Sequence, residues 1–443
     1  MCSTRPLLLS LFASTGLLAC NPSDFNSILD KAPVLDLGTP GSSTGALFVL
    51  PMPAPDPATK VAARMLVSRK DSNFVGLADY DMNGKATLQA ASAVMTAVGY
   101  PIYSSAMRAD GMIILGTPSF GGTQTPPGRV STLSVGSNAD GSPSFVVQAG
   151  NPTINPTTRL GISVAAGNVT GAPTGDFVAV SDSAVHLFGT DPTTPIATSP
   201  ATCLALISST GEAYGSRPVV VADLLLGGLD EIVLGGLVPD QVLFVQYKGT
   251  SDSLCPTVVL ANGSSAGFGT SLAVGDFDGD GHMDLAVGAP PNHVFVYFGP
   301  LDAATTAAAS YDVDIAGSTP TQLGKQLSTY FLPGQAAAQL LVADPAGPSP
   351  GGVGKTMLFT ITRTTPGLPG GTAQLVATLF DSDKDSAPGL FGLNLGGVPF
   401  NMGLCSPAGA VQLVPWASLG SDILTFFAYS GGPKDPRCFA RQP

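Results

Sequence analysis

The chain has 443 residues and a formal net charge of −12, although only 11 % of its residues are charged. This negative charge argues against nucleic acid and against anionic membrane surfaces as partners. The 54 glycines and 39 prolines are typical of short strands joined by many turns, whereas an α/β fold would need long helices.

The N-terminus is similar to a bacterial lipoprotein signal. Arg5 precedes the apolar stretch LLLSLFASTGLLAC, which is too short to span a bilayer. The segment Leu17-Leu18-Ala19-Cys20 resembles a lipobox, which implies a lipid on Cys20; an ordinary secretory peptide cut nearby is the alternative. We expect a signal peptide over 1–19, a lipid-anchored linker over 20–33 and the folded domain over 34–443. Asn21 after the cysteine favours the outer membrane of the cell envelope over the inner one.

An apolar residue followed by glycine recurs along the chain at steps of 54, 54 and 55 residues, in Leu160-Gly161, Tyr214-Gly215, Phe268-Gly269 and Leu323-Gly324. Fifteen residues after these glycines stand the apolar stretches DFVAVSD, DEIVLGG, DLAVGAP and QLLVADP. Aromatic third stretches follow, namely AVHLFG, QVLFVQYKG, HVFVYFG and KTMLFTI. Two recurring features at a common offset indicate an internal repeat.

Three more units are predicted with weaker signals: Gly45 with ARMLVS and NFVGL, Gly99 with DGMIILGTP, and Gly403 with SDILTFFAY. Each unit has room for four strands of about five to six residues with turns. Seven such units predict an all-β fold, a seven-bladed β-propeller, since a sandwich needs no fixed step. Little chain remains for a fourth strand after Tyr429, so we expect VLDLG (34–38) or GALFVL (45–50) to pair into the last blade.

One loop between two predicted strands is rich in carboxylates. Asp276, Asp278, Asp280 and Asp284 take positions 1, 3, 5 and 9, and Gly281 supplies a bend at position 6, as in an EF-hand loop. We expect His282, at position 7, to offer its backbone carbonyl. Oxygen ligands alone suit a hard cation and indicate Ca²⁺ rather than zinc or copper. The alternative is an acidic surface turn without metal.

The context of this loop is not that of an EF-hand. Val287 stands where the EF-hand has its Glu, and LAVGAP is typical of a strand rather than a helix. Phe268-Gly269, the DxDxDGxxD loop and Val287-Gly288-Ala289-Pro290 together resemble the FG-GAP repeat of integrin α-chain propellers and their bacterial relatives, over residues 268 to 299. The resemblance implies that the loop joins the first two strands of a blade and binds Ca²⁺.

Other candidate metal sites are weaker. The corresponding loops of the neighbouring units lack the carboxylates, so we expect one firm Ca²⁺ site. A possible second loop holds Asp79, Asp81, Asn83, Lys85 and Thr87 outside the repeat register; an Asx-rich turn that caps a short helix over 87–99 is the alternative. Asp381, Asp383 and Asp385 alternate similarly but have no glycine bend.

Four cysteines remain after Cys2 and Cys20, and an even number in an oxidising compartment suggests two disulfides. Three connectivities are possible. We favour Cys203 with Cys255 and Cys405 with Cys438, because these pairs close short loops.

Two motifs typical of enzymes lack their structural context. Residues 263–267 match GxSxG, with Asp284 and His293 downstream, but a strand follows where a nucleophile elbow needs a helix. Likewise, Gly354-Lys355-Thr356 precedes a strand, not the helix N-terminus that would hold a phosphate. We therefore expect no catalytic residues and no enzyme activity.

The sequence thus favours a non-catalytic, Ca²⁺-stabilised cell-envelope lipoprotein. We expect it to act as a binding or adhesion module for a protein or glycan ligand, and to meet the membrane through the Cys20 lipid alone. The alternatives are a structural component of an envelope assembly and, third, a propeller enzyme acting on polysaccharide.

Overall fold

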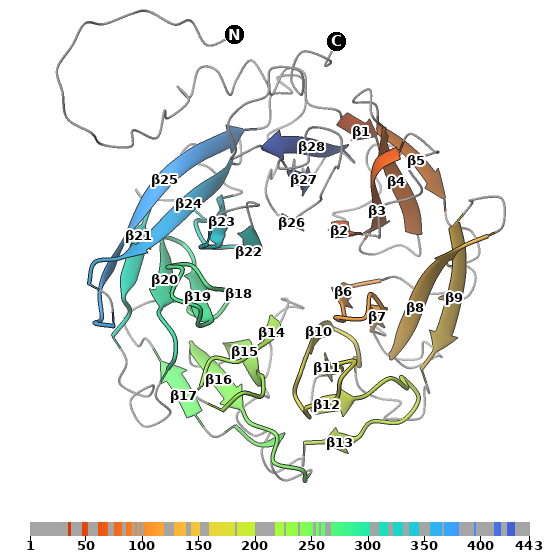
Figure 1. Cartoon of the computed structure of the whole chain (residues 1–443), viewed down its shortest axis with the longest axis horizontal. Helices are drawn as coiled ribbons and strands as arrows, with labels where there is room; N and C mark the ends of the chain where they lie inside the picture. The colour runs from red at the N-terminus through yellow and green to blue at the C-terminus, as the bar shows by residue number, and fades with distance from the viewer. Residues whose placement is uncertain are drawn as a thin grey trace, which may run out of the picture.

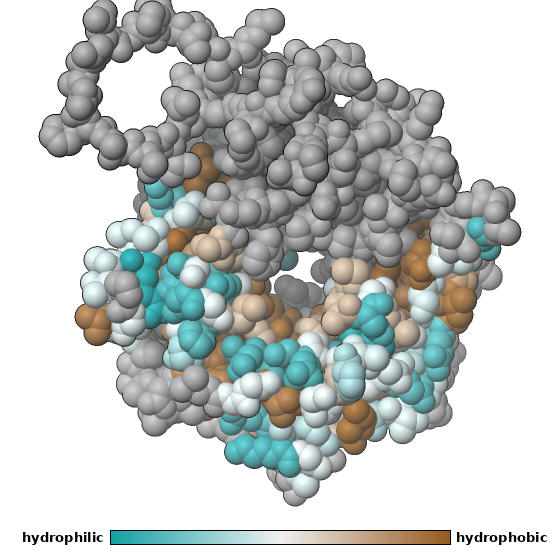
Figure 2. Space-filling model, viewed as in Figure 1, coloured by the Kyte–Doolittle hydropathy of each residue, from teal (hydrophilic) through white to brown (hydrophobic). Residues whose placement is uncertain are grey.

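The computed structural model of the chain describes residues 34–36, 47–51, 61–69, 75–81, 86–90, 94, 98, 102–118, 128–138, 143–150, 159–181, 184–199, 218–225, 227–237, 240–250, 254–256, 258–261, 267–301, 310–317, 322–330, 336–344, 355–365, 367–380, 394–395, 412–417 and 423–429. In these ranges the strands form seven four-stranded antiparallel sheets, arranged in a ring as the blades of a β-propeller (Figure 1). The predicted fold class and number of blades are therefore confirmed. Figure 2 shows that this face of the ring is open at its centre.

The blades follow one another in chain order, and each runs outward from the centre of the ring (Figure 1). Blade 1 consists of β2 (Leu47–Pro51), β3 (Val61–Arg69), β4 (Val75–Asp81) and β5 (Ala86–Ala90). Blade 2 consists of β6 (Ser104–Met107), β7 (Ile113–Thr117), β8 (Arg129–Ser137) and β9 (Pro143–Ala149). Blade 3 consists of β10 (Ser163–Gly167), β11 (Asp176–Val180), β12 (Val185–Phe188) and β13 (Ala197–Thr198).

Blade 4 consists of β14 (Val219–Ala222), β15 (Glu231–Leu237), β16 (Gln241–Val245) and β17 (Val258–Ala261). Blade 5 consists of β18 (Ser271–Gly275), β19 (Asp284–Ala289), β20 (His293–Tyr297) and β21 (Val313–Ala316). Blade 6 consists of β22 (Leu327–Tyr330), β23 (Gln339–Asp344), β24 (Lys355–Arg363) and β25 (Gly371–Phe380). Blade 7 consists of β26 (Asn394–Leu395), β27 (Gln412–Ala417), β28 (Ile423–Tyr429) and β1 (Val34–Asp36).

The hydrophobic core lies in the seams between blades. Second strands such as β11 and β19 are buried along their whole length, because neighbouring blades cover both faces of each sheet. The outer strand β21 instead alternates buried and exposed residues. One cluster joins Val178 of blade 3 to Ile232 of blade 4, and another joins Phe244 of blade 4 to Phe268 of blade 5. The ring is therefore held together mainly by apolar burial between successive repeats.

The repeated glycine has a structural cause. Gly161, Gly269 and Gly324 have φ of +88°, +87° and +82°, a backbone conformation that a side chain disfavours. The N–H of Gly269 donates to the carbonyl of Gly288 on the second strand of its own blade, at 3.0 Å. Each glycine thus fixes the turn at the start of its blade.

The carbonyl of the same glycine faces the preceding blade. A Cβ on Gly288 of blade 5 would lie 2.1 Å from the oxygen of Gly324, and Ser271 Oγ donates to that oxygen at 2.6 Å. Gly116 and Ser104 of blade 2 meet the oxygen of Gly161 in the same way. The glycine recurs about once per blade in the sequence because it makes these contacts between neighbouring blades.

The ring closes by combining the two ends of the chain. β1 pairs antiparallel with β28, with Val34 opposite Thr425 and Asp36 opposite Ile423. The expectation that a strand from the VLDLG segment completes the last blade is confirmed for Val34–Asp36, whereas Leu47–Pro51 forms the inner strand of blade 1 instead.

The last unit was placed wrongly from the sequence. SDILTFFAY contains β28, the third strand of blade 7 and not the second, and β26 precedes Gly403. Because the fourth strand of this blade comes from the N-terminus, its repeat cannot be read from the spacing inside the last unit.

The predicted helix over 87–99 is also partly wrong. Its first residues belong to β5, which pairs with β4 at the edge of blade 1, while Val94 and Val98 are helical and buried. Backbone pairing at a sheet edge overrides the helix propensity of this alanine-rich stretch. Within the described residues, no helix has the length and apolarity that a membrane crossing requires.

Candidate metal centre

The candidate site is the loop between β18 and β19, the first two strands of blade 5. Asp276 follows β18 directly and Asp284 begins β19, opposite Gly275 in the antiparallel register. Gly279 and Gly281 have φ of +80° and +90°, so the loop bends twice where only glycine fits readily. The loop position expected for an FG-GAP repeat is therefore the one found.

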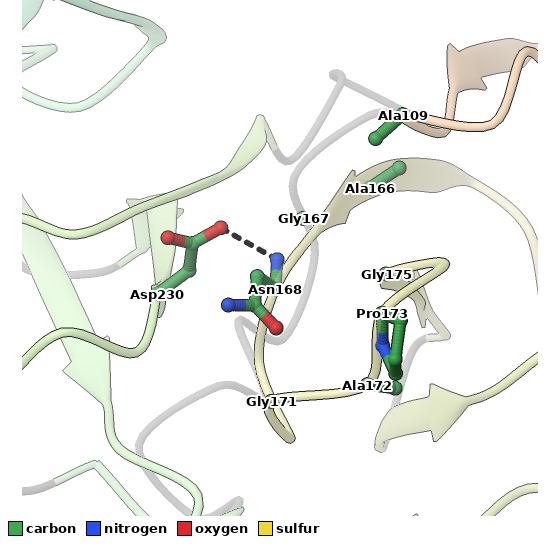
Figure 3. A pocket seen from close by; sticks show the side chains of 9 residues that line it. All are labelled: Ala109, Ala166, Gly167, Asn168, Gly171, Ala172, Pro173, Gly175 and Asp230. Carbon is green, nitrogen blue, oxygen red and sulfur yellow. Dashed lines mark hydrogen bonds between the residues drawn. The ribbon is translucent and has the colours of Figure 1, made fainter.

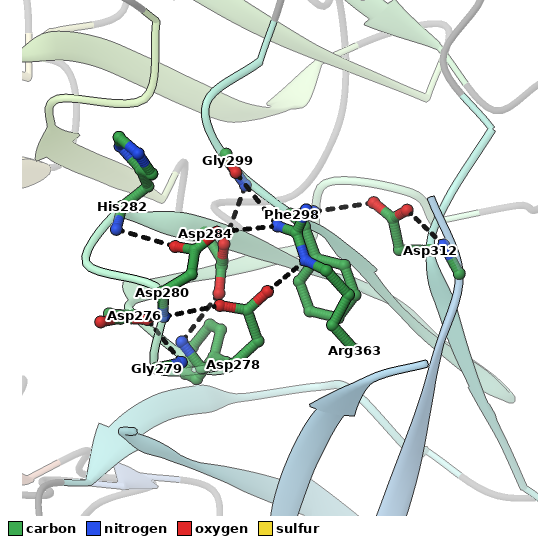
Figure 4. Close-up of polar contacts among 12 residues, drawn as sticks. Asp276, Asp278, Gly279, Asp280, His282, Asp284, Phe298, Gly299, Asp312 and Arg363 are labelled. Carbon is green, nitrogen blue, oxygen red and sulfur yellow. Dashed lines mark hydrogen bonds and ion pairs between the residues drawn. The ribbon is translucent and has the colours of Figure 1, made fainter. Parts of the chain in front are cut away.

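Three of the predicted ligands converge. Carboxylate oxygens of Asp276, Asp278 and Asp284 lie within 4.8 Å of one another. The three come from the start, middle and end of the loop, and the turns between them bring them together (Figure 4). An all-oxygen donor set of this kind suits a hard cation such as Ca²⁺, so these residues fit the metal that the sequence predicts.

Backbone N–H groups hold these carboxylates in place. Asp284 is fully buried and accepts hydrogen bonds from Phe277 N at 2.7 Å and Gly299 N at 2.8 Å. Asp276 accepts from Gly279 N at 2.7 Å and Gly281 N at 2.9 Å. A carboxylate has about four lone-pair sites, so both groups can still ligate a cation.

The pKa of Asp284 is raised from 3.8 to about 7, mainly by burial; the two N–H bonds lower it, and the charges of Asp278 and Asp280 contribute to the increase. A buried carboxylate beside two others is costly to ionise. A divalent cation among these oxygens would favour the ionised form, because it is the largest local charge in such a site.

Asp280 and His282 lie at the edge of the cluster. Asp280 is not one of the three converging carboxylates: its Oδ1 accepts from His282 N at 2.9 Å, and its Oδ2 lies 3.2 Å from Arg363 Nη2. His282 is exposed. Ligation by Asp280 and by the His282 carbonyl remains a prediction.

Arg363 is the residue that the sequence analysis missed. It ends β24 of blade 6, and its Nε donates to Asp278 Oδ2 across the seam (Figure 4). Its Nη2 donates to the carbonyl of Gly299 at 3.1 Å, and its guanidinium lies 4.6 Å from the centre of the Phe298 ring. Burial alone would lower the pKa of Arg363, but the bond to Asp278 and the nearby acidic charges raise it. Only the propeller geometry brings this residue to a loop 85 positions away.

In the corresponding loops of blades 3 and 4, neutral donor groups hold the acid that begins the second strand. In blade 3, Asp176 begins β11 as Asp284 begins β19, and it accepts from Thr170 N at 2.7 Å and Thr170 Oγ1 at 3.0 Å. In blade 4, Glu231 Oε2 accepts from Leu224 N and Leu225 N, both at 2.9 Å. Glu231, opposite Ala222, takes position 9 of this loop, so position 1 is Asp223 and not Ala222 as the glycine spacing suggests. A buried acid at the start of the second strand is thus a structural feature that does not itself require metal.

A pocket of about 410 Å³ lies over the β10–β11 loop of blade 3, with Ala109 of blade 2 on one side and Asp230 of blade 4 on the other (Figure 3). Small residues of the β10–β11 loop line it, and Asp230 is its single charged side chain. Asp230 Oδ2 accepts from Asn168 N at 2.6 Å. The pocket offers a ligand mainly backbone groups and one carboxylate.

Among the described residues of the two enzyme motifs, His293 and Lys355 have other partners. His293 Nδ1 pairs with Asp314 at 2.9 Å and not with Asp284. Residues 263–266 lie outside the described ranges. Lys355 and Thr356 begin strand β24, as the sequence predicts.

The second metal loop remains a prediction. Asp79 and Asp81 lie in β4 and Thr87 lies in β5, so this turn joins the third and fourth strands of blade 1 rather than the first two. Asn83, Lys85 and the run from Asp381 to Asp385 lie outside the described residues.

The lipidation and disulfide predictions fall largely outside the described ranges too. Cys20, Cys203, Cys405 and Cys438 are not described. Cys255 lies before β17 and is disulfide-bonded. The favoured pairings therefore stay predictions.

Comparison with known proteins gives a family match in blade 5. The FG-GAP repeat family matches residues 268–299, which include the loop, β18, β19 and β20. The chain is a β-propeller with an FG-GAP repeat in its fifth blade. Among solved structures it is similar to one titled "Structure of Dos1 propeller", with 10 % identity, a TM-score of 0.43, and coverage of 84 % of this chain and 76 % of that one. No curated protein matches the chain.

Proposed function

We propose that the chain is a non-catalytic binding or adhesion module of the cell envelope, anchored by a lipid on Cys20 and stabilised by Ca²⁺ in blade 5. The observation that carries the metal part is the convergence of Asp276, Asp278 and Asp284 within 4.8 Å, in a loop that matches the FG-GAP repeat. The lipid anchor rests on the lipobox-like segment that ends at Cys20.

The binding role rests on the architecture. Seven blades present their connecting loops around the rim and centre of one ring, and such loops vary without disturbing the strands that support them. The pocket over blade 3 offers backbone groups, the Asn168 amide and the Asp230 carboxylate. Such groups suit recognition of hydroxyl-rich or basic ligands, that is, a glycan or a protein surface.

The metal part is tested by thermal unfolding of the chelator-treated full chain with and without Ca²⁺. Extracellular Ca²⁺ modules bind with a Kd of roughly 10⁻⁴–10⁻³ M. At about 2 mM Ca²⁺ and a Kd of about 0.2 mM, the bound ion adds about 1.4 kcal/mol to the free energy of unfolding. For so large a domain this raises Tm by about 2 °C. Asp278→Ala should abolish the response and leave a folded β protein.

Asp314→Ala is the matched control. Asp314 lies on β21 of the same blade and pairs with His293, away from the loop. This variant should keep the Ca²⁺ response. If Asp278→Ala responds to Ca²⁺ like the wild type, the ion binds elsewhere.

The binding part is tested with envelope fractions. Immobilised chain should retain a defined protein or a purified envelope glycan, and chelation should weaken that retention by loosening blade 5. Turnover of the glycan would instead identify a propeller enzyme, and co-purification in a fixed stoichiometric assembly would identify a structural component.

A further inference from the structure

We propose that Arg363 is a built-in competing cation that weakens Ca²⁺ binding in blade 5 and so sets the affinity of the site. The inference rests on the proposed Ca²⁺ site and concerns a residue of the neighbouring blade. Arg363 contacts two of the five predicted ligand residues, Asp278 and Asp280.

The guanidinium of Arg363 pairs with carboxylates that are also predicted to bind the metal. Asp278 Oδ2 accepts from Arg363 Nε while its Oδ1 accepts from Asp280 N at 3.1 Å, so both oxygens are engaged. Asp280 Oδ2 lies 3.2 Å from Arg363 Nη2, so the guanidinium pairs with a second predicted ligand as well. Asp276 differs, because its oxygens accept from backbone N–H groups and from no cationic side chain in the described residues.

Arg363 is held in this position by partners other than the carboxylates. Its Nη2 donates to the Gly299 carbonyl, its guanidinium packs on the Phe298 ring, and its side chain is 13 % exposed. Gly299 also donates its N–H to Asp284, so one residue fixes both the arginine and a ligand of the site. The arginine therefore stays close when a second cation enters.

Asp312 also holds blade 5 against blade 6. Its Oδ2 accepts from Phe298 N and its Oδ1 accepts from Gly370 N of blade 6, both at 2.8 Å. Phe298 is thus tied to blade 6 through its backbone and through its ring. Because blades 5 and 6 are held together at these points, Arg363 has little room to move away from the carboxylates.

Two cations that share carboxylates repel each other. For a unit charge and a double charge about 6 Å apart in a water-like dielectric, the repulsion corresponds to roughly a tenfold loss of affinity. Replacing Arg363 by a neutral residue should therefore lower the Ca²⁺ Kd roughly tenfold, whereas a residue that merely positions the ligands would raise the Kd when removed.

The test compares Ca²⁺ titrations, by calorimetry and by thermal shift, of chelator-treated wild type, Arg363→Met, Arg363→Gln and Arg363→Lys. We expect both neutral variants to bind Ca²⁺ at least threefold more tightly, and Arg363→Lys, which keeps the charge, to stay within threefold of wild type. Arg363→Gln serves if the methionine variant does not fold.

Arg108→Met is the matched control. Arg108 lies in blade 2 and its Nη1 donates to the carbonyl of Gly189 at 3.1 Å, as Arg363 does to Gly299, but far from the metal loop. It should lower Tm and leave the Kd unchanged.

The outcomes separate this inference from the proposed function. If the wild type binds Ca²⁺ and the neutral variants bind with an unchanged or higher Kd, the competition is refuted while the Ca²⁺ site stands. If only the neutral variants bind Ca²⁺, the competition is supported and Ca²⁺ stabilisation of the wild type fails. If none of them binds Ca²⁺, both ideas fail.

Discussion

The carbonyl oxygen of Gly324 lies where the side chain of Gly288 would be, with 2.1 Å between that oxygen and an ideal Cβ. The two glycines belong to adjacent blades, so their contact sets the distance between the inner parts of blades 5 and 6. Ser271 Oγ lies 2.2 Å from the same ideal Cβ and would have to move as well, whereas the Gly324 oxygen belongs to the backbone of the next blade and cannot turn aside. The glycine of the VGAP stretch is thus required by its neighbour in the next repeat.

We expect Gly288→Ala to destabilise the protein by about 2 kcal/mol or more, because overpacking forces backbone shifts. Equilibrium denaturation of the full chain measures this change.

Gly227→Ala is the control for that substitution. Its Cβ would meet only the Leu225 oxygen, at 3.8 Å, an ordinary contact. This change should fall within about 0.5 kcal/mol of zero. Equal effects at the two positions would show that the seam contact is not tight.

A buried histidine makes stability depend on pH. His186 of β12 is 2 % exposed, burial lowers its pKa from 6.5 to about 4, and Thr198 Oγ1 lies 3.1 Å from its Nδ1. Between pH 4 and 6.5 the unfolded chain therefore binds more protons at this site than the folded chain. By linkage, its contribution to stability rises with pH across this window and is lost in acid, by up to about 3 kcal/mol.

His186→Gln removes the titration and keeps a polar group for Thr198. The difference in unfolding free energy between wild type and variant should move in favour of the wild type as pH rises from 4 to 6.5, and then level off. A difference that stays constant over this range would show that His186 titrates normally in the fold.

Much of the fold could be predicted from the sequence because each repeat leaves local marks. The glycine before the first strand, the buried acid that begins the second strand and the aromatic third strand reflect contacts that recur in several of the described blades, and blade 5 shows them at Gly269, Asp284 and Tyr297. The carboxylates of the candidate metal loop are close together in the chain, so their spacing alone predicted a cluster, and three of them converge in the structure.

Features that depend on distant segments could not be predicted in this way. Arg363 reaches the loop from another blade, and nothing near it in the sequence marks it as a partner of Asp278. The last blade lost its repeat register because one of its strands comes from the N-terminus. The strand β5 forms from alanine-rich sequence because β4 offers it backbone partners.

The lipid anchor is tested by fractionation. We expect Cys20→Ser to release the protein from the membrane fraction, because the thiol that would carry the diacylglyceryl group is gone. Cys2→Ser is the control, since Cys2 lies within the predicted signal peptide, and it should leave the protein in the membrane pellet. Unchanged pelleting of the Cys20 variant would refute the lipoprotein assignment.

Asp284 should give a pH dependence opposite to that of His186. Burial raises its pKa from 3.8 to about 7, so between these values the folded chain binds the proton that the unfolded chain releases. In the presence of chelator, its contribution to stability is therefore greatest in acid and falls as pH rises from about 4 to 7, by up to about 4 kcal/mol. Ca²⁺ should cancel this loss, because the ion favours the carboxylate.

Asp284→Asn isolates this effect, since the amide does not titrate. With chelator, the stability of the wild type relative to the variant should decline from pH 4 to 7; with saturating Ca²⁺ the decline should disappear or reverse. Asp176→Asn is the matched control, because Asp176 is equally buried and begins the second strand of blade 3, where Thr170 is its partner. That variant should keep the effect of Ca²⁺ on the pH profile. If the relative stability of Asp284→Asn is the same with and without Ca²⁺ at pH 7, Asp284 is a structural carboxylate like Asp176 and not a ligand.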